Sequence, residues 1–279
     1  MTELPAPLLI TVAPNGARRG KSDHEALPLT AGEIALTAAR CRLAGAAMIH
    51  LHVRDEDEAH SLAPEHYRAA QREIRRLAGK DLLVQVTTES GGVYGVAQQM
   101  AAVRALTVDA ASFAIREFFP GDAINAQVAE FFAWIIARGV ACQFILYTPA
   151  EIDRLKALVA RGLIALPRPH ALFVLGRHAV DQQSDPADLD GFLASWPADW
   201  PWSVCAFGRA ELEVAAKAIR LGGHVRVGFE NNLQDSDGAT LPSNEARVQQ
   251  VAQLAAAVGR PLAGAAEARA LFSLPATAG

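Results

Sequence analysis

The sequence is poor in the features that mark several protein classes. Its three cysteines, Cys41, Cys142 and Cys205, are scattered in apolar surroundings without CxxC spacing, so we expect inert core thiols in a reducing compartment. The net charge of -4 argues against a nucleic-acid partner. No apolar run approaches the roughly 18 residues that a membrane span needs, and residues 1–5 lack the basic region of a secretion signal. We therefore expect a soluble, cytoplasmic protein.

Charged residues are also scarce, at 20%, whereas 51% of the residues are hydrophobic, which is ample for a large core. Eight short segments are apolar and rich in strand-forming residues. Most are continuously apolar, as parallel strands covered by helices are. The expected strands are Leu8–Ala13, Met48–Val53, Leu82–Thr87, Ala110–Ala114, Ala141–Tyr147, Ala171–Leu175, Trp202–Ala206 and Val225–Glu230.

Amphipathic stretches separate these strands. The first opens with a capping box at Thr30-Ala31-Gly32-Glu33 and runs to about residue 43. Eight strand–helix units in series predict a single (β/α)8 TIM barrel over residues 1–279. An open doubly wound sheet would want a glycine-rich loop after the first strand, which residues 14–18 do not provide. The other expected helices are Pro64–Leu77, Val96–Leu106, Asn125–Ala137, Glu151–Val159, Pro186–Ala194, Ala210–Leu221 and Asn244–Val258.

The most informative motif is His50-Leu51-His52 at the end of the second strand. Residues i and i+2 of a strand share a face, so both imidazoles point the same way. The motif alone leaves a metal site and two ordinary polar residues equally open. The last strand ends in Glu230, on the rim where such barrels carry active sites and one strand away from the histidines. Two histidines and one glutamate are a familiar set for catalytic zinc, although another divalent metal is possible.

Other polar residues follow the strands on the same rim. Arg226 lies inside an otherwise apolar strand, so it must form a structural ion pair or orient a ligand. Among the other rim residues are Asn15, Arg18, Arg54, Thr87, Thr88, Glu89, Ser112, Arg116 and Tyr147.

Nearly the whole chain resembles the β-keto acid cleavage enzymes, the family of 3-keto-5-aminohexanoate cleavage enzyme. The resemblance is carried by the combination of His50-Leu51-His52-Val53-Arg54 with Gly222-Gly223-His224-Val225-Arg226-Val227-Gly228-Phe229-Glu230. Residues 27–30, 44–46, 173–176, 243–244, 259–263 and 267–269 add to it.

This resemblance implies a TIM barrel that binds Zn²⁺ through His50, His52 and Glu230. It also implies a reaction of a small β-keto acid with acetyl-CoA that gives acetoacetate and a new acyl-CoA, in a homo-oligomer, most simply a tetramer. Arg226 would orient a catalytic carboxylate or steady developing charge. The substrate would be held by a hydroxyl of Thr87 or Ser112, with Asn15 close by.

The chain departs from the family at the residue after the ligand glutamate. The family usually has an aspartate there, which looks like the general base, and this chain has Asn231. An amide cannot accept a proton in a useful range, so another group, such as Glu89, would serve. Alternatively, the barrel runs another metal-assisted carbonyl reaction, or binds metal and carboxylate without turnover. If the family's route is kept, Asn231→Asp is expected to raise the cleavage rate.

Two arginines are further departures. Arg18 stands where the amine-binding member has a glutamate, and Arg116 stands where a glycine is usual. An arginine pairs well with carboxylate or phosphate, so we expect a substrate whose far end is anionic or strongly polar. The alternatives are that one or both arginines pair with Glu89 or point to solvent, or that one of them meets the phosphates of CoA. Among the remaining histidines, His60 and His66 are expected to be solvated and His224 to begin the last strand at the opposite rim.

Overall fold

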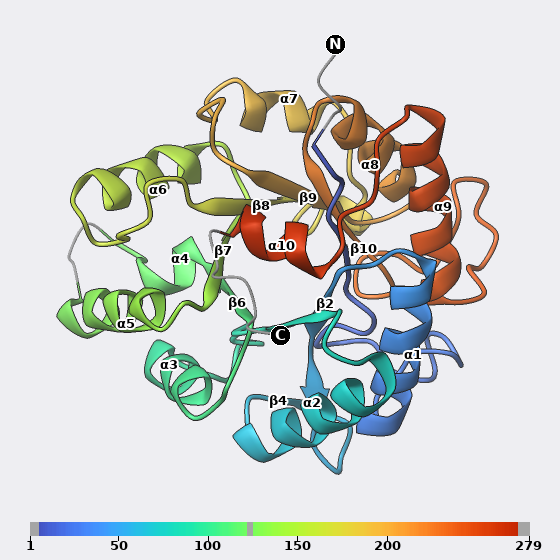
Figure 1. Ribbon diagram of the computed structural model, residues 1–279, viewed down its shortest axis with the longest axis horizontal. Coiled ribbons are helices and arrows are strands. Elements are labelled where there is room, and N and C mark those ends of the chain that lie inside the picture. Colours follow the sequence, from blue (N-terminus) through green and yellow to red (C-terminus); the bar gives the residue numbers. More distant parts are fainter. Residues whose placement is uncertain (1–5, 122–124, 273–279) are drawn as a thin grey trace.

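The computed structural model describes residues 6–121 and 125–272, and its centre is a closed barrel of eight parallel strands (Figure 1). Around the ring the strands follow the order β1-β10-β9-β8-β7-β6-β5-β2. The predicted TIM barrel is confirmed. The strands are β1 (Ile10–Val12), β2 (Met48–Leu51), β5 (Leu83–Val86), β6 (Ala110–Ala114), β7 (Ala141–Leu146), β8 (His170–Leu175), β9 (Trp202–Ala206) and β10 (His224–Val227).

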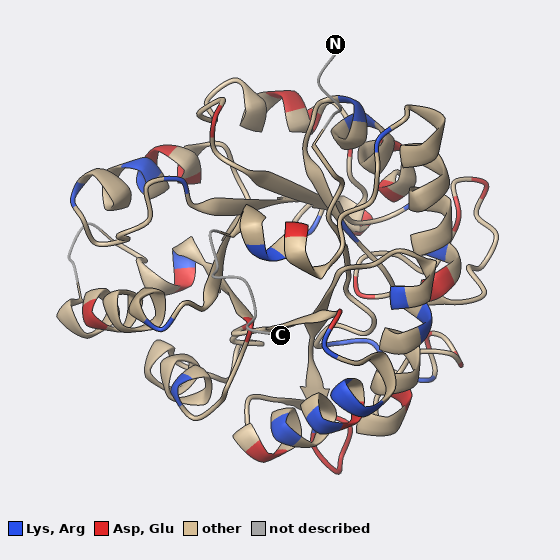
Figure 2. Cartoon of the chain, viewed as in Figure 1, with Lys and Arg blue, Asp and Glu red and all other residues tan. Residues whose placement is uncertain are grey.

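Helices cover the outside of the barrel, and the charged residues lie mainly on these helices and on the loops (Figure 2). None of the helices in the described part of the chain has the length and apolarity that a membrane crossing requires. The covering helices are α1 (Ala31–Ala44), α2 (Pro64–Ala78), α3 (Val96–Arg104), α5 (Ala126–Ala137), α6 (Ala150–Ala160), α7 (Asp188–Leu193), α8 (Glu211–Arg220) and α9 (Asn244–Ala257).

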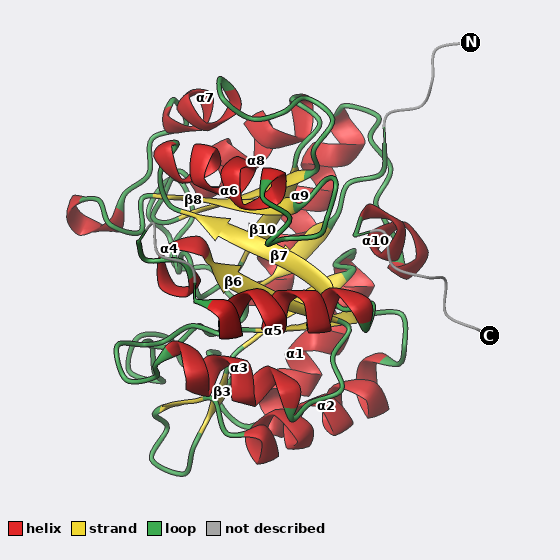
Figure 3. Cartoon of the chain, turned by 90° about the vertical axis from the view of Figure 1, so that its left-hand side faces the viewer, coloured by secondary structure: helices red, strands yellow, loops and turns green. Residues whose placement is uncertain are grey.

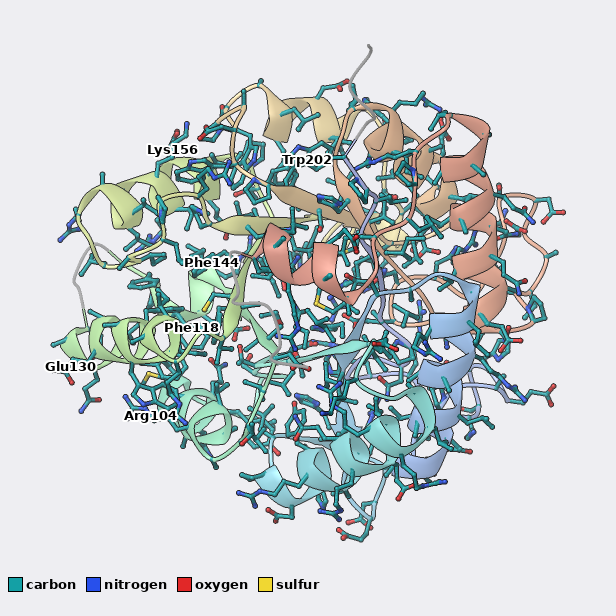
Figure 4. All side chains as sticks on the ribbon, in the orientation of Figure 1. Arg104, Phe118, Glu130, Phe144, Lys156 and Trp202 are labelled. Atoms are coloured by element: carbon teal, nitrogen blue, oxygen red, sulfur yellow. The ribbon has the colours of Figure 1, made fainter. Side chains whose placement is uncertain are left out.

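Local chemistry explains where these elements begin and end. Thr30 and Glu33 form the predicted capping box of α1, which ends at Gly45 in the left-handed conformation, with a φ of 116°. Aromatic rings fill the space between the sheet and α5: Phe113 of β6 lies 5.1 Å from Phe132 and 6.4 Å from Phe144, ring centre to ring centre. Phe144, labelled in Figure 4 together with Phe118, lies on the α5 side of the barrel. The three cysteines are buried and free, as expected.

Several short elements were not predicted. A hairpin of β3 (Val53–Arg54) and β4 (His60–Ser61) follows β2. Helix α4 (Ile115–Phe118) directly follows β6, and a 3-10 helix spans Val180–Gln182. Helix α10 (Ala265–Leu271) lies across the end where the strands begin (Figure 3), and its Ala268 packs with first residues of strands such as Met48 and Leu83. The functional loops therefore occupy the opposite end.

The last strand is shorter than predicted. It ends at Val227 and not at Glu230, because Gly228 adopts a φ of 135° and turns the chain out of the sheet. The backbone N–H of Glu230 then donates to the carbonyl of Ala13, at 3.0 Å, which ties the turn to the end of β1. This turn, rather than the strand itself, places the Glu230 carboxylate over the barrel.

Candidate metal centre and cavity

Three potential metal ligands converge at the carboxyl end of the barrel. His50 and His52 come from β2 and its end, and Glu230 comes from the turn after β10; both strands neighbour β1. The two histidine Nε2 atoms are 3.2 Å apart, and Glu230 Oε2 lies 3.7 Å from that of His50 and 3.4 Å from that of His52. The structure therefore brings together the three residues that the sequence motifs single out.

This arrangement fits a divalent metal. A tetrahedral ion with bonds of about 2.0–2.1 Å separates its ligand atoms by about 3.3 Å, close to all three spacings. Glu230 Oε2 is buried and has no hydrogen-bond partner among the described residues, as expected of an atom reserved for a ligand. Nitrogen and carboxylate donors suit zinc and several other divalent ions.

A chain of amides holds His50 in the orientation that a metal needs. Gln85 on β5 donates through Nε2 to Oε1 of Gln143, at 3.1 Å, so its own Oε1 faces His50 Nδ1 at 2.8 Å. That oxygen can only accept, so Nδ1 carries the proton and Nε2 keeps its lone pair free. Burial lowers the pKa of His50 to about 3, and the ring is therefore neutral at pH 7.

Arg226 holds the Glu230 carboxylate through the oxygen that does not face the histidines. Its guanidinium is buried and donates to Glu230 Oε1 at 3.1 Å, leaving Oε2 for the cluster. Burial raises the pKa of Glu230, but the Arg226 guanidinium, together with the neighbouring imidazoles of His52 and His50, lowers it by more and holds it well below its usual range. Arg226 therefore combines the two roles expected for it: it forms a buried ion pair with Glu230, and this pair orients Glu230 as a candidate metal ligand.

Asn231 is held by a second buried network. Its Oδ1 accepts from Arg226 at 3.3 Å, and its Nδ2 donates to the Arg226 carbonyl at 3.1 Å and to Glu211 Oε1 at 3.4 Å. Glu211 begins α8 and pairs with Arg247 of α9, Nε to Oε2, at 3.0 Å. Burial raises the pKa of Glu211 to about 7, although Arg247 opposes the rise. Asn231 is thus fully buried and is not among the residues that line the cavity at the metal cluster.

A cavity adjoins the cluster, and Glu89 stands on its wall. The apolar residues that line the cavity include Ala114, Ile145 and Val174, and the polar ones include His50 and Glu230 of the cluster together with Thr87, Thr88 and Tyr147. Glu89 Oε2 lies 3.8 Å from His52 Nε2, and its other oxygen lies 3.6 Å from a guanidinium nitrogen of Arg177. Among the described residues, Glu89 is therefore the carboxylate nearest to the cluster that is not itself part of it.

A second, outer cavity opens beyond Glu89 and contains two of the predicted residues, Asn15 and Arg18. Asn15 is buried and donates to the carbonyls of Pro28, at 2.9 Å, and His52, at 3.3 Å. Arg18 is exposed. Between them, Gly16 has a φ of +66°, and a Cβ there would lie 2.6 Å from Glu230 Cγ, so only glycine fits against the ligand.

Two predicted residues lie elsewhere. Ser112 is buried within β6 and is not among the residues that line either cavity, because its position on the strand is too deep in the barrel. Arg116 pairs with Glu151, Nε to Oε1 at 2.7 Å, and lies over the Tyr147 ring at 4.2 Å from its centre. The expectation that Arg116 overhangs the cluster is wrong, because a carboxylate on α6 and an aromatic face engage it first.

The structure also adds residues that the sequence did not reveal. His60, expected in solvent, is half-buried: its Nε2 lies 2.9 Å from the Glu89 carbonyl and its ring 5.3 Å from that of His52. Glu117 and Arg177 line the inner cavity, and burial raises the pKa of Glu117. In the sequence, only two signals could have pointed to them: Glu117 directly follows Arg116, and Arg177 comes just after an expected strand.

His224 lies at the opposite end of the barrel, as predicted. It begins β10, and its Nδ1 accepts a hydrogen bond from the N–H of Leu9, at 2.9 Å.

Known proteins resemble this chain along nearly its full length. Residues 7–274 match the family model described as beta-keto acid cleavage enzyme. A 3-keto-5-aminohexanoate cleavage enzyme of Fusobacterium nucleatum is 33% identical over 277 residues, which cover 96% of this chain and 98% of that protein. A 3-oxoadipate:acetyl-CoA acetyltransferase of Cupriavidus necator is 32% identical over 285 residues, covering 96% of this chain and 95% of that protein.

Solved structures support the same architecture. ObcA, in a ternary complex with a C4-CoA adduct and oxalate, superposes with a TM-score of 0.68 at 18% sequence identity. The match covers 89% of this chain and 67% of the ObcA chain. At this identity the likeness concerns the barrel fold alone.

Proposed function

Because the chain belongs to the β-keto acid cleavage enzyme family, we propose that it exchanges acyl groups between a β-keto acid and acetyl-CoA at a divalent metal held by His50, His52 and Glu230. The observation that carries this proposal is the mutual spacing of the three ligand atoms beside a cavity whose wall carries the Glu89 carboxylate. The relatives act in the same class of reaction: one is a 3-oxoadipate:acetyl-CoA acetyltransferase.

We propose zinc as the metal, because two imidazoles and one carboxylate leave a position open for substrate. When bound, the ion would polarise the keto oxygen of the substrate and stabilise the enolate formed beside it. Gln85 keeps the His50 lone pair directed at the cluster, and Arg226 keeps Glu230 ionised and aligned. These two contacts prepare the site before substrate arrives.

Glu89 is the group we propose as the general base in place of Asn231. It lines both cavities and lies beside His52, whereas the Asn231 amide is occupied by Arg226 and Glu211. Glu89 would remove a proton from C2 of the β-keto acid and later return it. A positioned base typically contributes about 10²–10⁴-fold to a rate.

The steps balance without an oxidant or reductant. The C2 carbanion attacks the thioester carbonyl of acetyl-CoA, a C–C bond forms, and the CoA thiolate leaves. The thiolate then adds to the original keto carbon, the bond between that carbon and C2 breaks, and C2 regains its proton from Glu89. The products are acetoacetate and a new acyl-CoA. Thr87 and Tyr147 line the space where the substrate would lie.

The proposal is tested by metal analysis and by a CoA-exchange assay. Protein purified without chelator is expected to hold about one metal ion per chain and to convert acetyl-CoA to a second acyl-CoA with some member of a β-keto acid panel. His50→Ala should abolish both properties, since two protein ligands are too few. His66→Ala is the matched control, because His66 on α2 contacts Ser61 and Glu56 and lies outside the cluster.

Each result has a distinct meaning. No metal and no uptake of added zinc would refute the metal centre. Metal without CoA exchange, but with breakdown of a β-keto acid, would favour another carbonyl reaction, and binding without any turnover would favour a non-catalytic barrel. Light scattering of the same sample tests the predicted homotetramer.

A further inference from the structure

The inner and outer cavities share one wall, and Arg177 stands on it. Glu89, Arg177, Phe207 and Glu230 line both spaces. Arg177 follows β8, and its guanidinium lies 5.1 Å from the centre of the Phe207 ring. A molecule bound at the metal cluster and extending outward would therefore pass this side chain.

The Arg177 guanidinium is short of partners. Its one anionic contact among the described residues is Glu89 Oε1, at 3.6 Å, which is longer than a charged hydrogen bond of about 2.7–2.9 Å. The side chain is only 19% exposed, yet its guanidinium nitrogens are not among the buried atoms without a partner, so its N–H groups reach the cavities. A largely buried cation with unused donors that line a cavity is suited to an anionic ligand.

The surrounding charges also favour an anion. The outer cavity is lined by Arg18, Arg19 and Arg177 against Glu89 and Glu230. Arg226 already engages Glu230, at 3.1 Å. Arg18 has no hydrogen bond or ion pair with another residue in the described ranges 6–121 and 125–272. Two arginines at the mouth are therefore available to a ligand.

We propose that Arg177, assisted by Arg18, selects a β-keto acid that bears a second carboxylate at the end remote from its β-keto group. This inference rests on the proposed function and adds the class of substrate. A divalent metal at the cluster would meet the charge of the β-keto acid end, and Arg226 is already paired with Glu230, so Arg177 and Arg18 remain for a second anionic group. The planar guanidinium pairs with a carboxylate through two parallel hydrogen bonds, which a neutral or ammonium end cannot accept.

Three six-carbon substrates that differ only at C5 and C6 test the proposal: 3-oxoadipate, 3-oxohexanoate and 3-oxo-5-aminohexanoate. The wild type is expected to have its highest kcat/KM with the diacid. Arg177→Gln should lower kcat/KM for the diacid by about 10–100-fold, the usual effect of losing a charged hydrogen bond, and change the neutral substrate little. Arg177→Lys should keep part of the preference, and Arg18→Glu should shift preference toward the amino substrate.

Arg209→Gln is the matched control. Arg209 is also an arginine after a neighbouring strand, but its Nε donates to Gln234 Oε1, at 3.2 Å, and it lines neither of the two cavities. Its replacement should leave all three substrates unaffected. The KM for acetyl-CoA is measured in parallel.

Wild-type preference for the neutral or amino substrate would overturn the proposal. Equal losses on all three substrates in Arg177→Gln would also overturn it, and would mean that Arg177 positions Glu89 or, if the KM for acetyl-CoA rises, that it binds CoA. Failure of all turnover would count against the proposed function. In that event, calorimetric titration of 3-oxoadipate and 3-oxohexanoate into the protein separates the two ideas, because tighter binding of the diacid supports the inference and equal or absent binding refutes it.

Discussion

Replacing Asn231 with aspartate tests whether this position has a catalytic or a structural role. The family's usual residue would put a carboxylate where the amide now lies between Arg226 and Glu211. One oxygen would remain 3.3 Å from the Arg226 guanidinium, and the other would replace Nδ2, 3.4 Å from Glu211 Oε1. The structure therefore predicts that Asn231→Asp destabilises the protein and brings no gain in rate, in contrast to the expectation from the family pattern alone.

The magnitude follows from these distances. At an effective dielectric constant of about 20, like charges 3.4 Å apart repel by about 5 kcal/mol, and the attraction to Arg226 is of similar size, so the two nearly cancel. What remains is the loss of the two hydrogen bonds that Nδ2 of Asn231 donates. The Glu211 carboxylate and the Arg226 carbonyl, both buried acceptors, would then face another acceptor, the oxygen of the new aspartate. Such unsatisfied groups cost about 1–3 kcal/mol. We expect the free energy of unfolding to fall by about this amount.

The loss should depend on pH. Burial raises the pKa of Glu211 to about 7, and a second carboxylate beside it would raise it further. A carboxyl whose folded pKa is raised stabilises the fold while protonated, and this stabilisation is lost as pH rises through the folded pKa. The difference between the variant and the wild type should therefore be small at pH 5.5 and larger at pH 8.5. Urea denaturation at both pH values measures it.

Further variants isolate the cause. Asn231→Ala removes the same hydrogen bonds without adding charge, so its loss of stability should not grow with pH in this way. Glu211→Gln alone removes the partner of the buried Arg247 and should itself destabilise the protein, so it serves as the reference. Adding Asn231→Asp to Glu211→Gln should cost less stability than adding it to the wild type, since a glutamine amide can donate to the new carboxylate. A rise of tenfold or more in cleavage rate with unchanged stability would refute the structural reading and assign the base to position 231.

Three other predictions concern the cluster and its wall. Glu89→Gln should lower kcat by about 10²–10⁴-fold with metal content unchanged, as rapid-quench assays and elemental analysis would report; an active variant would exclude Glu89 as the base. Gly16→Ala should weaken metal binding, measured by competition with a chelator, because its Cβ would press on Glu230 Cγ; unchanged affinity would contradict the tight contact. Gln85→Leu should lower metal affinity by about 10–100-fold, the usual effect of losing an outer partner of a ligand, whereas Gln71→Leu on α2 should not.

The barrel could be predicted because its signals are local. Three of these signals can be recognised in the sequence without knowledge of tertiary contacts: the continuously apolar strands, the capping box of α1 and the alternation of strands with helices. The His50–His52 pair could be located because strand periodicity fixes its direction. Glu230 was placed correctly on the rim, but the exit from the sheet at Gly228 was missed, since glycine inside an apolar run does not reveal its φ.

The rest of the site depends on partners distant in sequence. Arg116 was expected over the cluster, but Glu151, which meets it, belongs to the helix-forming segment after the following strand and looks like an ordinary first-turn acid. Asn231 likewise takes its role from Glu211 on α8. The partner of a long polar side chain depends on which residues the fold brings within its reach. The pattern of apolar residues along a strand does not contain that information.

The position of the ligands on the ring also bears on how the protein folds. Strand β1 pairs with β2 on one side and β10 on the other, so the cluster bridges the seam at which the first and last strands meet. During synthesis, a nascent chain that has not yet reached Glu230 exposes two histidines but cannot form the three-ligand site. Capture of a metal ion by all three residues would therefore have to wait until the last strand closes the barrel, and the bound ion would then link the two ends of the sheet.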